Sequence, residues 1–360
     1  MPHASATHYD TIVAGAGPAG VMAALRAAKR GPVLLADSSA LPRDKSCGGM
    51  LNEYAQSFLA SFTEVPSRFI LEPKHVSFRF WDWDRDIKKP TELRFLNVDR
   101  RSFDQWLISL LPDSVEVIDS AAVRDFTQDA DGVNVTIRNG GAPEQLRCNN
   151  LIGCDGARSL VRRRLGMGTV ANYVTLQEFV RVEGELEPYF DCIYMRGIGD
   201  SYAYSYIVPK GDTAIVGSVY YPKTKRPHEK HEAILQILRK SLPLGESIKR
   251  EASVALSIRQ PKDVVRGLGR VLLAGEAGGF MSPTSGEGIS YAMNSGQLAG
   301  EAVARSSAED VLGAYDRATA YISANIRRKL RWLPFMESAW GKYLAGFVPT
   351  SLVSRVTRGL

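Results

Sequence analysis

Gly15-Ala16-Gly17-Pro18-Ala19-Gly20 is the stretch that decides the fold of this 360-residue chain. It follows the apolar run 11–14 and precedes the helix-like stretch 21–29, so we predict a strand, a tight turn and a helix. Glycines in such a turn let the backbone approach a pyrophosphate, and the free N–H groups of a helix N-terminus bind phosphate. The next apolar run, 33–36, ends at Asp37, close to the roughly 20-residue spacing of an acid that binds a ribose hydroxyl. The stretch therefore predicts a dinucleotide site on a doubly wound parallel sheet.

Two further glycine-centred segments follow, Cys154-Asp155-Gly156 within 151–163 and Gly275-Glu276 at the start of 275–289. Together with the first stretch they resemble the FAD-binding fingerprints of the flavoprotein superfamily that contains aromatic hydroxylases and geranylgeranyl reductases. In that superfamily the late motif brings an acid to the ribityl chain of the flavin, and the resemblance gives this role to Glu276, where Asp is usual. A dehydrogenase that uses NAD alone requires neither later motif, so FAD is the predicted cofactor.

The segment 42–51 contains Cys47-Gly48-Gly49, which resembles the Cys-Gly-Gly stretch of the geranylgeranyl reductase family. In that family the stretch lies beside the flavin ring. The resemblance implies that Gly48 and Gly49 bring backbone N–H groups to the ring and that Cys47 faces the substrate. Cys47 then either donates a proton or only lines the pocket.

Basic residues near these motifs are candidates for holding the phosphates or the flavin. Arg100 matches the position in a family helix whose arginine reaches FAD, and Arg101 is the alternative. Arg43 and Lys45 follow the ribose-binding strand and are further phosphate candidates. The cofactor residues that the resemblance implies are Gly15, Ala16, Gly17, Pro18, Ala19, Gly20, Asp37, Ser38, Lys45, Cys47, Gly48, Gly49, Arg100, Val123, Asp155, Gly156, Gly275, Glu276, Gly286, Gly288 and Ile289.

The stretch 204–210 resembles the substrate-lobe signature of the same family, with Tyr206 where Trp is usual. The resemblance implies that Tyr204, Tyr206 and Pro209 bind the substrate. Tyr204 is also the alternative to Cys47 as a catalytic proton donor. A purely structural interpretation stays open, because alternating tyrosines also describe one face of an ordinary strand.

The chain is expected to leave the dinucleotide lobe and return to it, since alternating aromatic and β-branched residues between the motifs predict a separate antiparallel sheet. The predicted fold class is α/β: a Rossmann-type FAD-binding lobe interleaved with an antiparallel β-sheet substrate lobe, plus a C-terminal helical segment. The expected limits are 8–74, 96–170 and 262–310 for the FAD-binding lobe, 75–95 and 171–261 for the substrate lobe, and 311–360 for the C-terminal segment.

The net charge of +6 originates in the C-terminal segment, where seven basic residues follow Ile326 against one acid, Glu337. Aromatic and aliphatic residues alternate with these charges, which predicts one or two amphipathic basic helices after a helix over 311–329. One interpretation is a cap packed on the main lobe with solvated arginines. The other is a segment that contacts anionic lipid peripherally or guards an apolar entrance. No stretch approaches the 18 or so continuous apolar residues of a membrane-spanning helix, and no nucleic-acid-binding module is recognisable.

The cysteines and histidines exclude several other chemistries. Four cysteines without CxxC spacing favour a reducing cytoplasm over a disulfide scaffold. The N-terminus lacks the pattern of a signal peptide. All five histidines lie outside the flavin motifs, so no metal site and no histidine triad are predicted.

The resemblance predicts an FAD-dependent oxidoreductase of the geranylgeranyl-reductase-like type, which reduces C=C bonds of an apolar, isoprenoid or lipid-like substrate by hydride transfer from reduced flavin. No separate NAD(P)H-binding domain is evident, so the expected reductant is transiently bound NAD(P)H or a ferredoxin-like donor. One alternative is an FAD-dependent monooxygenase that hydroxylates an aromatic or polyketide-like substrate. Another is a non-catalytic flavin-binding redox sensor. The sequence leaves the substrate and the oligomeric state open.

Overall fold

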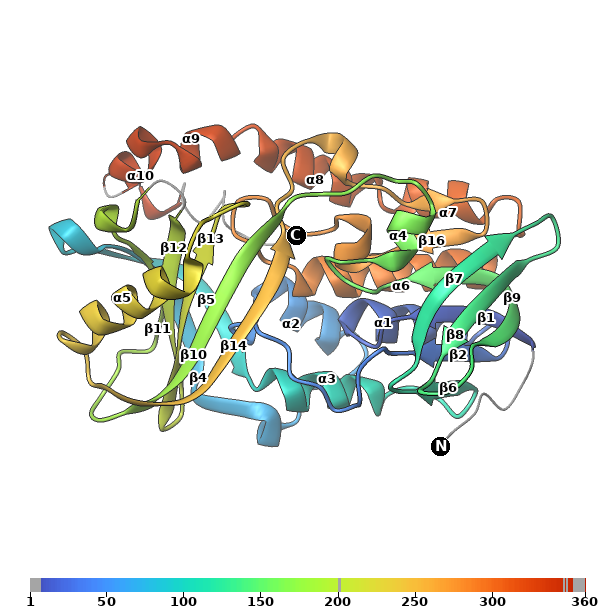
Figure 1. Cartoon of the computed structure of the whole chain (residues 1–360), viewed down its shortest axis with the longest axis horizontal. Helices are drawn as coiled ribbons and strands as arrows, with labels where there is room; N and C mark the ends of the chain where they lie inside the picture. Colours follow the sequence, from blue (N-terminus) through green and yellow to red (C-terminus); the bar gives the residue numbers. More distant parts are fainter. Residues whose placement is uncertain (1–7, 200–201, 346, 348, 352–359) are drawn as a thin grey trace.

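The computed structural model describes residues 8–199, 202–345, 347, 349–351 and 360 of the chain. Its long axis passes through two β-sheets, one at each end, and the C-terminal helices run along one side (Figure 1). One sheet is mainly parallel and the other is mainly antiparallel. This arrangement confirms the predicted α/β fold class with two interleaved lobes.

The first sheet has a centre of five parallel strands in the order β16, β9, β1, β2 and β6. Alternate residues of β1 enter two different apolar cores, with Val13 beside α1 and Ile12 on the opposite face. Burial on both faces explains why these strands are continuous apolar runs. The bounds are β1 (His8–Ala14), β2 (Val33–Ala36), β6 (Val115–Ile118), β9 (Glu144–Gly153) and β16 (Val271–Leu273).

Helices α1 (Pro18–Ala27) and α6 (Ile289–Arg305) pack closely on one face of this sheet. The contact requires glycine on α6, because a Cβ at Gly296 would lie 2.1 Å from the carbonyl oxygen of Ala19. On the other face, an antiparallel hairpin pairs with β9. The remaining elements of this lobe are the hairpin strands β7 (Ala122–Gln128) and β8 (Val133–Arg138), with β15 (Gly267–Leu268), α2 (Glu53–Ala60), α3 (Arg100–Ile108) and α4 (Leu160–Arg164).

The second sheet has eight strands in the order β14, β10, β13, β12, β11, β4, β5 and β3. All its pairs are antiparallel except β4 with β11, which is parallel. The strands are β3 (Met50–Leu51), β4 (Ile70–Asp82), β5 (Ile87–Val98), β10 (Asn172–Val182), β11 (Tyr189–Tyr194), β12 (Tyr202–Lys210), β13 (Thr213–Tyr220) and β14 (Leu244–Leu256). Strands β4 and β5 thus extend beyond 75–95; the lobe limits given above stay a prediction.

Helix α5 (Pro227–Arg239) covers one face of the second sheet through Ile234, Leu235 and Leu238. Along β12, Ile207 packs toward this helix, whereas Tyr206 and Val208 belong to a different apolar cluster. The face that carries Tyr206 is therefore directed away from α5 and toward the rest of the molecule.

The described part of the C-terminal segment forms four helices, α7 (Val311–Ala318), α8 (Ala320–Leu330), α9 (Leu333–Glu337) and α10 (Ala339–Ala345). The single helix predicted over 311–329 is wrong, because the chain breaks at Thr319, whose hydroxyl donates to the carbonyl oxygen of Tyr315 at 2.8 Å. Helices α8 to α10 run from the first lobe to the second (Figure 1). Among the described residues, no helix has the length and apolar character needed to cross a membrane.

Candidate functional site

A cleft of about 1360 Å³ lies between the two sheets, and residues of α9 and α10 close part of it. Pockets for single small molecules usually occupy about 300–1,000 Å³. The cleft therefore has room for a dinucleotide and for a second molecule beside it.

The turn after β1 forms one end of the cleft, and only glycine fits it at two positions. Gly15 has a φ of +102°, and a Cβ there would lie 2.5 Å from the carbonyl oxygen of Cys154. A Cβ at Gly20 would lie 1.8 Å from the carbonyl oxygen of Gly15. Gly17 and Pro18 line the cleft at the N-terminus of α1, where the missing N–H of proline costs no hydrogen bond. The turn thus presents its backbone to the cleft as a phosphate site requires.

Asp37 lies beside this turn at the end of β2. Its carboxylate accepts hydrogen bonds from the backbone N–H of Ala16 at 2.8 Å and of Ser39 at 2.9 Å. Arg43 forms an ion pair with the same carboxylate at 3.3 Å and lies over Gly17. Asp37 as the ribose-binding acid and Arg43 as a phosphate candidate were both predicted from the sequence. The structure brings the two side chains together at one end of the cleft. Ser38, Lys45 and Val123 also line the cleft.

The middle motif meets the late motif across the cleft. Asp155 accepts from the Ser159 hydroxyl at 2.5 Å and from the backbone N–H of Leu160 at 2.7 Å, so it caps α4. Burial raises the pKa of Asp155 above its ordinary value, although these hydrogen bonds oppose the rise. Gly156 has a φ of +73°, and a Cβ there would lie 4.0 Å from the carboxylate of Glu276.

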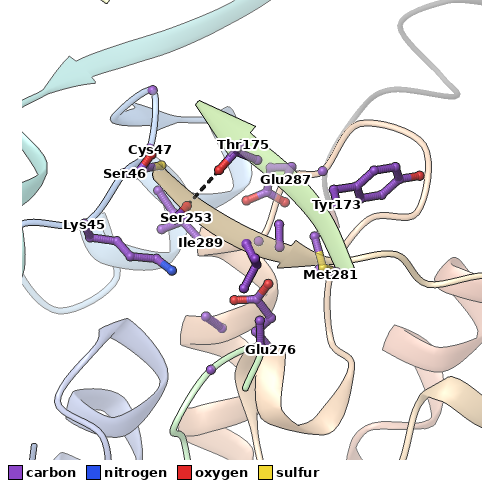
Figure 2. Close-up of a pocket in the computed structure, with 18 of the residues that line it drawn as sticks. Lys45, Ser46, Cys47, Tyr173, Thr175, Ser253, Glu276, Met281, Glu287 and Ile289 are labelled. Atoms are coloured by element: carbon purple, nitrogen blue, oxygen red, sulfur yellow. Dashed lines mark hydrogen bonds between the residues drawn. The ribbon is translucent and has the colours of Figure 1, made fainter. Parts of the chain in front are cut away.

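Glu276 is held by the second sheet, because its Oε1 accepts from the backbone N–H of Leu256 at 2.9 Å. Gly275 before it has a φ of +57° and lies against Ala19, where a Cβ would approach Ala19 Cβ to 2.8 Å. Gly286, Gly288 and Ile289 also line the cleft, around the start of α6. In Figure 2, Lys45, Ser46 and Cys47 lie on the side of the N-terminal loop, and the side chains from the late motif are Glu276, Met281, Glu287 and Ile289.

The Cys-Gly-Gly loop borders the middle of the cleft. Cys47 and Gly48 line it, whereas Gly49 lies behind them with a φ of +65°. The buried ammonium of Lys210 supports this loop from behind, donating to the carbonyl oxygen of Gly49 at 3.4 Å and to Asn97 Oδ1 at 2.5 Å. Among the predicted cofactor residues, Ala16, Gly20 and Gly49 do not line the cleft; they shape the turns beside it.

Arg100, and not Arg101, faces the cleft. Its guanidinium forms two 3.0 Å hydrogen bonds to Asp104. Burial lowers the pKa of Arg100, but Asp104 and Cys47 beside it outweigh burial and hold that pKa above its ordinary value. Arg101 instead forms an exposed ion pair with Asp44. A permanent positive charge therefore lies next to Cys47.

Aromatic side chains of the second sheet form the other end of the cleft. Tyr204 and Tyr206 line it, and the Tyr204 hydroxyl lies 3.5 Å from where a Cβ of Gly286 would be. The Tyr206 hydroxyl accepts from Gln177 Nε2 at 2.5 Å, and Gln177 Oε1 accepts from the Ser46 hydroxyl at 2.7 Å. Burial raises the pKa of both tyrosines, so both stay protonated. The further aromatic lining residues of this sheet are Phe78, Phe80, Phe95, Tyr173, Phe190 and Tyr194.

Pro209 corrects one expectation, because it does not line this cleft. Its carbonyl oxygen accepts from Asn97 Nδ2 at 2.9 Å, and it borders a separate cavity of about 270 Å³ with Pro73 and Gly211. Pro209 is therefore not placed to contact a molecule bound beside Tyr204.

Two residues of the site were missed by sequence reasoning. Glu287 lines the cleft and accepts from the Ser290 hydroxyl at 2.7 Å, and burial raises its pKa. Lys210 lies outside the cleft but supports its wall; a lysine ending an apolar strand was the available signal. The side chains of Trp332 and Phe335 close part of the cleft, as expected if the C-terminal segment guards its entrance.

A glycine turn at a helix N-terminus, a buried acid at the next strand and a second acid across the cleft together fit FAD. They define an FAD-binding oxidoreductase. The chain belongs to the family described as FAD binding domain, which matches residues 112–326, more than half of its length. The predicted family and cofactor are thereby confirmed.

The similarity to individual proteins covers nearly the whole chain. Protein CbrA of Escherichia coli is 30% identical over 334 residues, which cover 90% of this chain and 88% of that protein. The fold is similar to that of a geranylgeranyl bacteriochlorophyll reductase-like protein from Thermoplasma acidophilum, with a TM-score of 0.78, 20% identity and coverage of 98% and 92% of the two chains. It is also similar to the flavin-dependent brominase Bmp2, with a TM-score of 0.75, 19% identity and coverage of 98% and 93%.

Replacing Glu276 tests its role at the flavin. Glu276→Ala is expected to weaken FAD binding by about tenfold or more, because a hydrogen bond to a charged acceptor contributes about 1.5–3 kcal/mol. Glu276→Gln, which keeps an acceptor for Leu256, should lose less. Titration of apoprotein with FAD, followed by flavin fluorescence, measures the effect, with the α6 surface variant Glu301→Ala as control. Unchanged affinity in Glu276→Ala would contradict the assignment.

The buried lysine behind the Cys47 loop predicts a pH dependence of stability. Burial lowers the pKa of Lys210 from 10.5 to about 7. Between these values the unfolded chain binds more protons than the folded one, so the free energy of unfolding rises with pH across this window. The rise is on the order of a few kcal/mol, since each pKa unit corresponds to about 1.4 kcal/mol.

Lys210→Met should remove this rise, whatever constant amount of stability the substitution also changes. Urea unfolding at a series of pH values between neutral and alkaline gives the slope. The control is Lys240→Met at an exposed position, which should keep the slope of the parent protein. Parallel pH profiles for the parent protein and Lys210→Met would contradict the prediction, because they would mean that Lys210 keeps its charge in the folded protein over this whole pH window.

Proposed function

We propose that this oxidoreductase reduces a C=C bond of an apolar, isoprenoid or lipid-like molecule. The observation that carries the proposal is the continuity of the cleft: one end has the FAD motifs, the other has aromatic walls, and Cys47 and Tyr204 line it between them. An apolar molecule in the aromatic end would lie next to the flavin, and the aromatic walls would exclude water from the reaction.

The protein must supply the proton that such a reduction needs. The bound flavin, when reduced, supplies a hydride to one carbon of the double bond. Tyr204 is a candidate proton donor to the other carbon, because its hydroxyl lies beside Gly286 of the late motif. Burial raises the pKa of Tyr204, so the hydroxyl carries its proton before the reaction.

Cys47 is the second candidate donor. It lines the cleft next to the permanently charged Arg100. The reductant is proposed to be NAD(P)H that binds transiently, or a ferredoxin-like protein. A cytoplasmic setting remains part of the proposal, since four free cysteines suit a reducing compartment.

A single-turnover experiment tests the reaction. Protein with FAD bound is reduced without oxygen and mixed with geranylgeraniol and related polyprenyl alcohols in detergent. We expect the flavin absorbance to return faster with substrate than without it, and the product to gain two hydrogen atoms by mass spectrometry. If the flavin is oxidised only after O₂ is admitted, and the product then gains an oxygen atom, the protein is the monooxygenase instead. If neither NAD(P)H nor a ferredoxin-like donor leads to any product, the result would favour a non-catalytic flavin protein.

Tyr204→Phe identifies the proton donor. Loss of a general acid typically costs about 10²-fold or more, so hydrogenation in this variant should fall by that factor while FAD content stays unchanged. Tyr220→Phe on the neighbouring strand, outside the cleft, is the matched control. If Tyr204→Phe retains the parent rate and Cys47→Ala does not, the proton comes from Cys47.

A further inference from the structure

The exposed apolar side chains of the described chain concentrate in its C-terminal helices. Five large aromatic residues form what we call the docking face: Trp332, Phe335, Trp340, Tyr343 and Phe347, which are 46%, 43%, 73%, 44% and 62% exposed. The large apolar residues exposed elsewhere are mostly scattered singly over other elements. Contiguous exposed apolar patches of this kind mark contacts with proteins or membranes.

Positively charged side chains lie beside the docking face. The guanidinium of Arg85 lies 3.6 Å from the ring centroid of Tyr343 and 5.6 Å from that of Phe347. Arg327, Arg328 and Arg331 are exposed on α8 and at its end, and in the described part of the chain none of the three forms an ion pair with an acid. Arg85 also pairs with Asp82 at 3.5 Å, so the exposed arginines of α8 and Arg331, which directly precedes Trp332, carry the positive charge beside the docking face.

The docking face is continuous with the cleft. Trp332 and Phe335 are both partly exposed and part of the cleft lining, so they lie where the cleft reaches the surface. Leu333 between them is 5% exposed and anchors α9 in the core. Whatever covers the docking face therefore also covers this edge of the cleft.

We propose that the docking face binds the surface of an anionic phospholipid bilayer and places the edge of the cleft against it. Tryptophan and tyrosine favour the boundary between water and lipid, and neighbouring arginines are attracted to anionic headgroups. Since α9 and α10 are short and no described helix can span a bilayer, the contact is interfacial. A second copy of the chain fits less well, because pairing this face with itself would bring arginines of like charge together. Binding is independent of the reaction, but delivery of a lipid-like substrate from the bilayer rests on the proposed function.

Vesicle co-sedimentation of the full FAD-bound protein tests the proposal without any turnover. The probes are vesicles of phosphatidylcholine alone and of phosphatidylcholine mixed with phosphatidylglycerol. We expect binding to the mixed vesicles only, weakening as salt rises. The double variant Trp340→Ser with Phe347→Ser should lower the partition coefficient about tenfold or more, and Arg327→Gln with Arg331→Gln should lower it on mixed vesicles by a smaller factor. Because these side chains are exposed, the variants should keep the parent FAD content and melting temperature.

Controls use exposed residues elsewhere on the molecule. Ile248→Ser on β14, 51% exposed, removes apolar surface, and Lys240→Gln after α5 removes a charge; both should bind like the parent protein. Equal binding by the docking-face variants and these controls, or no binding to mixed vesicles, would overturn the proposal. A concentration-dependent dimer that Trp340→Ser abolishes would reassign the face to self-association. Turnover of detergent-dispersed substrate without vesicle binding would overturn the docking alone and leave the proposed reaction standing.

Discussion

The parallel pairing of β9 with both β1 and β16 is the constraint on which the site depends. Gly153 at the end of β9 is the register partner of Ala14 on β1 and of Leu273 on β16. The three flavin motifs therefore begin at the same level on one edge of the sheet, although more than a hundred residues separate them in sequence. Gly153 has no room for a side chain, because a Cβ there would lie 2.8 Å from the side chains of both Leu273 and Val161 of α4.

A second set of contacts fixes the Cys47 loop between the two sheets. Lys210 at the end of β12 donates to the backbone of this loop and to Val98 at the end of β5, so two strands of the second sheet and the loop share one ammonium group. On the cleft side, Ser46 bonds to Gln177, which in turn bonds to Tyr206. The loop that borders both the flavin motifs and the aromatic walls is thus held by contacts with the second sheet at Ser46 and Gly49.

The sequence predicted the parts of the site whose physical cause is local. Gly15, Gly156 and Gly275 need a positive φ or a close backbone contact, and Asp37 ends a buried strand at a fixed spacing. Features that depend on distant partners could not be predicted in this way. Pro209, by contrast, was misplaced although side-chain alternation along β12 puts it on the opposite face from Tyr204 and Tyr206.

Two other features were not predicted because they depend on contacts with residues elsewhere in the chain. The break at Thr319 depends on a hydrogen bond of its own hydroxyl, which competes with the helix backbone, and on Arg266 from outside the helix. The role of Lys210 depends on carbonyl groups that are far away in sequence. The same limit applies to α9 and α10, which close part of the cleft, since helical periodicity indicates which residues share a face but not what that face covers.

The attachment of the C-terminal segment explains why its outer surface is positive. Glu337 is the only acid after Ile326, and it is directed inward, where it accepts from the Tyr173 hydroxyl at 3.1 Å and pairs with Arg259. Both partners belong to the substrate lobe side of the molecule, and burial raises the pKa of Tyr173, which keeps this hydroxyl a donor. The one negative charge that would offset the arginines of α8 is thus used to close the cleft. Glu337 therefore links the two roles of the C-terminal segment, because the same ion pair that holds the segment over the cleft removes its single acid from the outer surface.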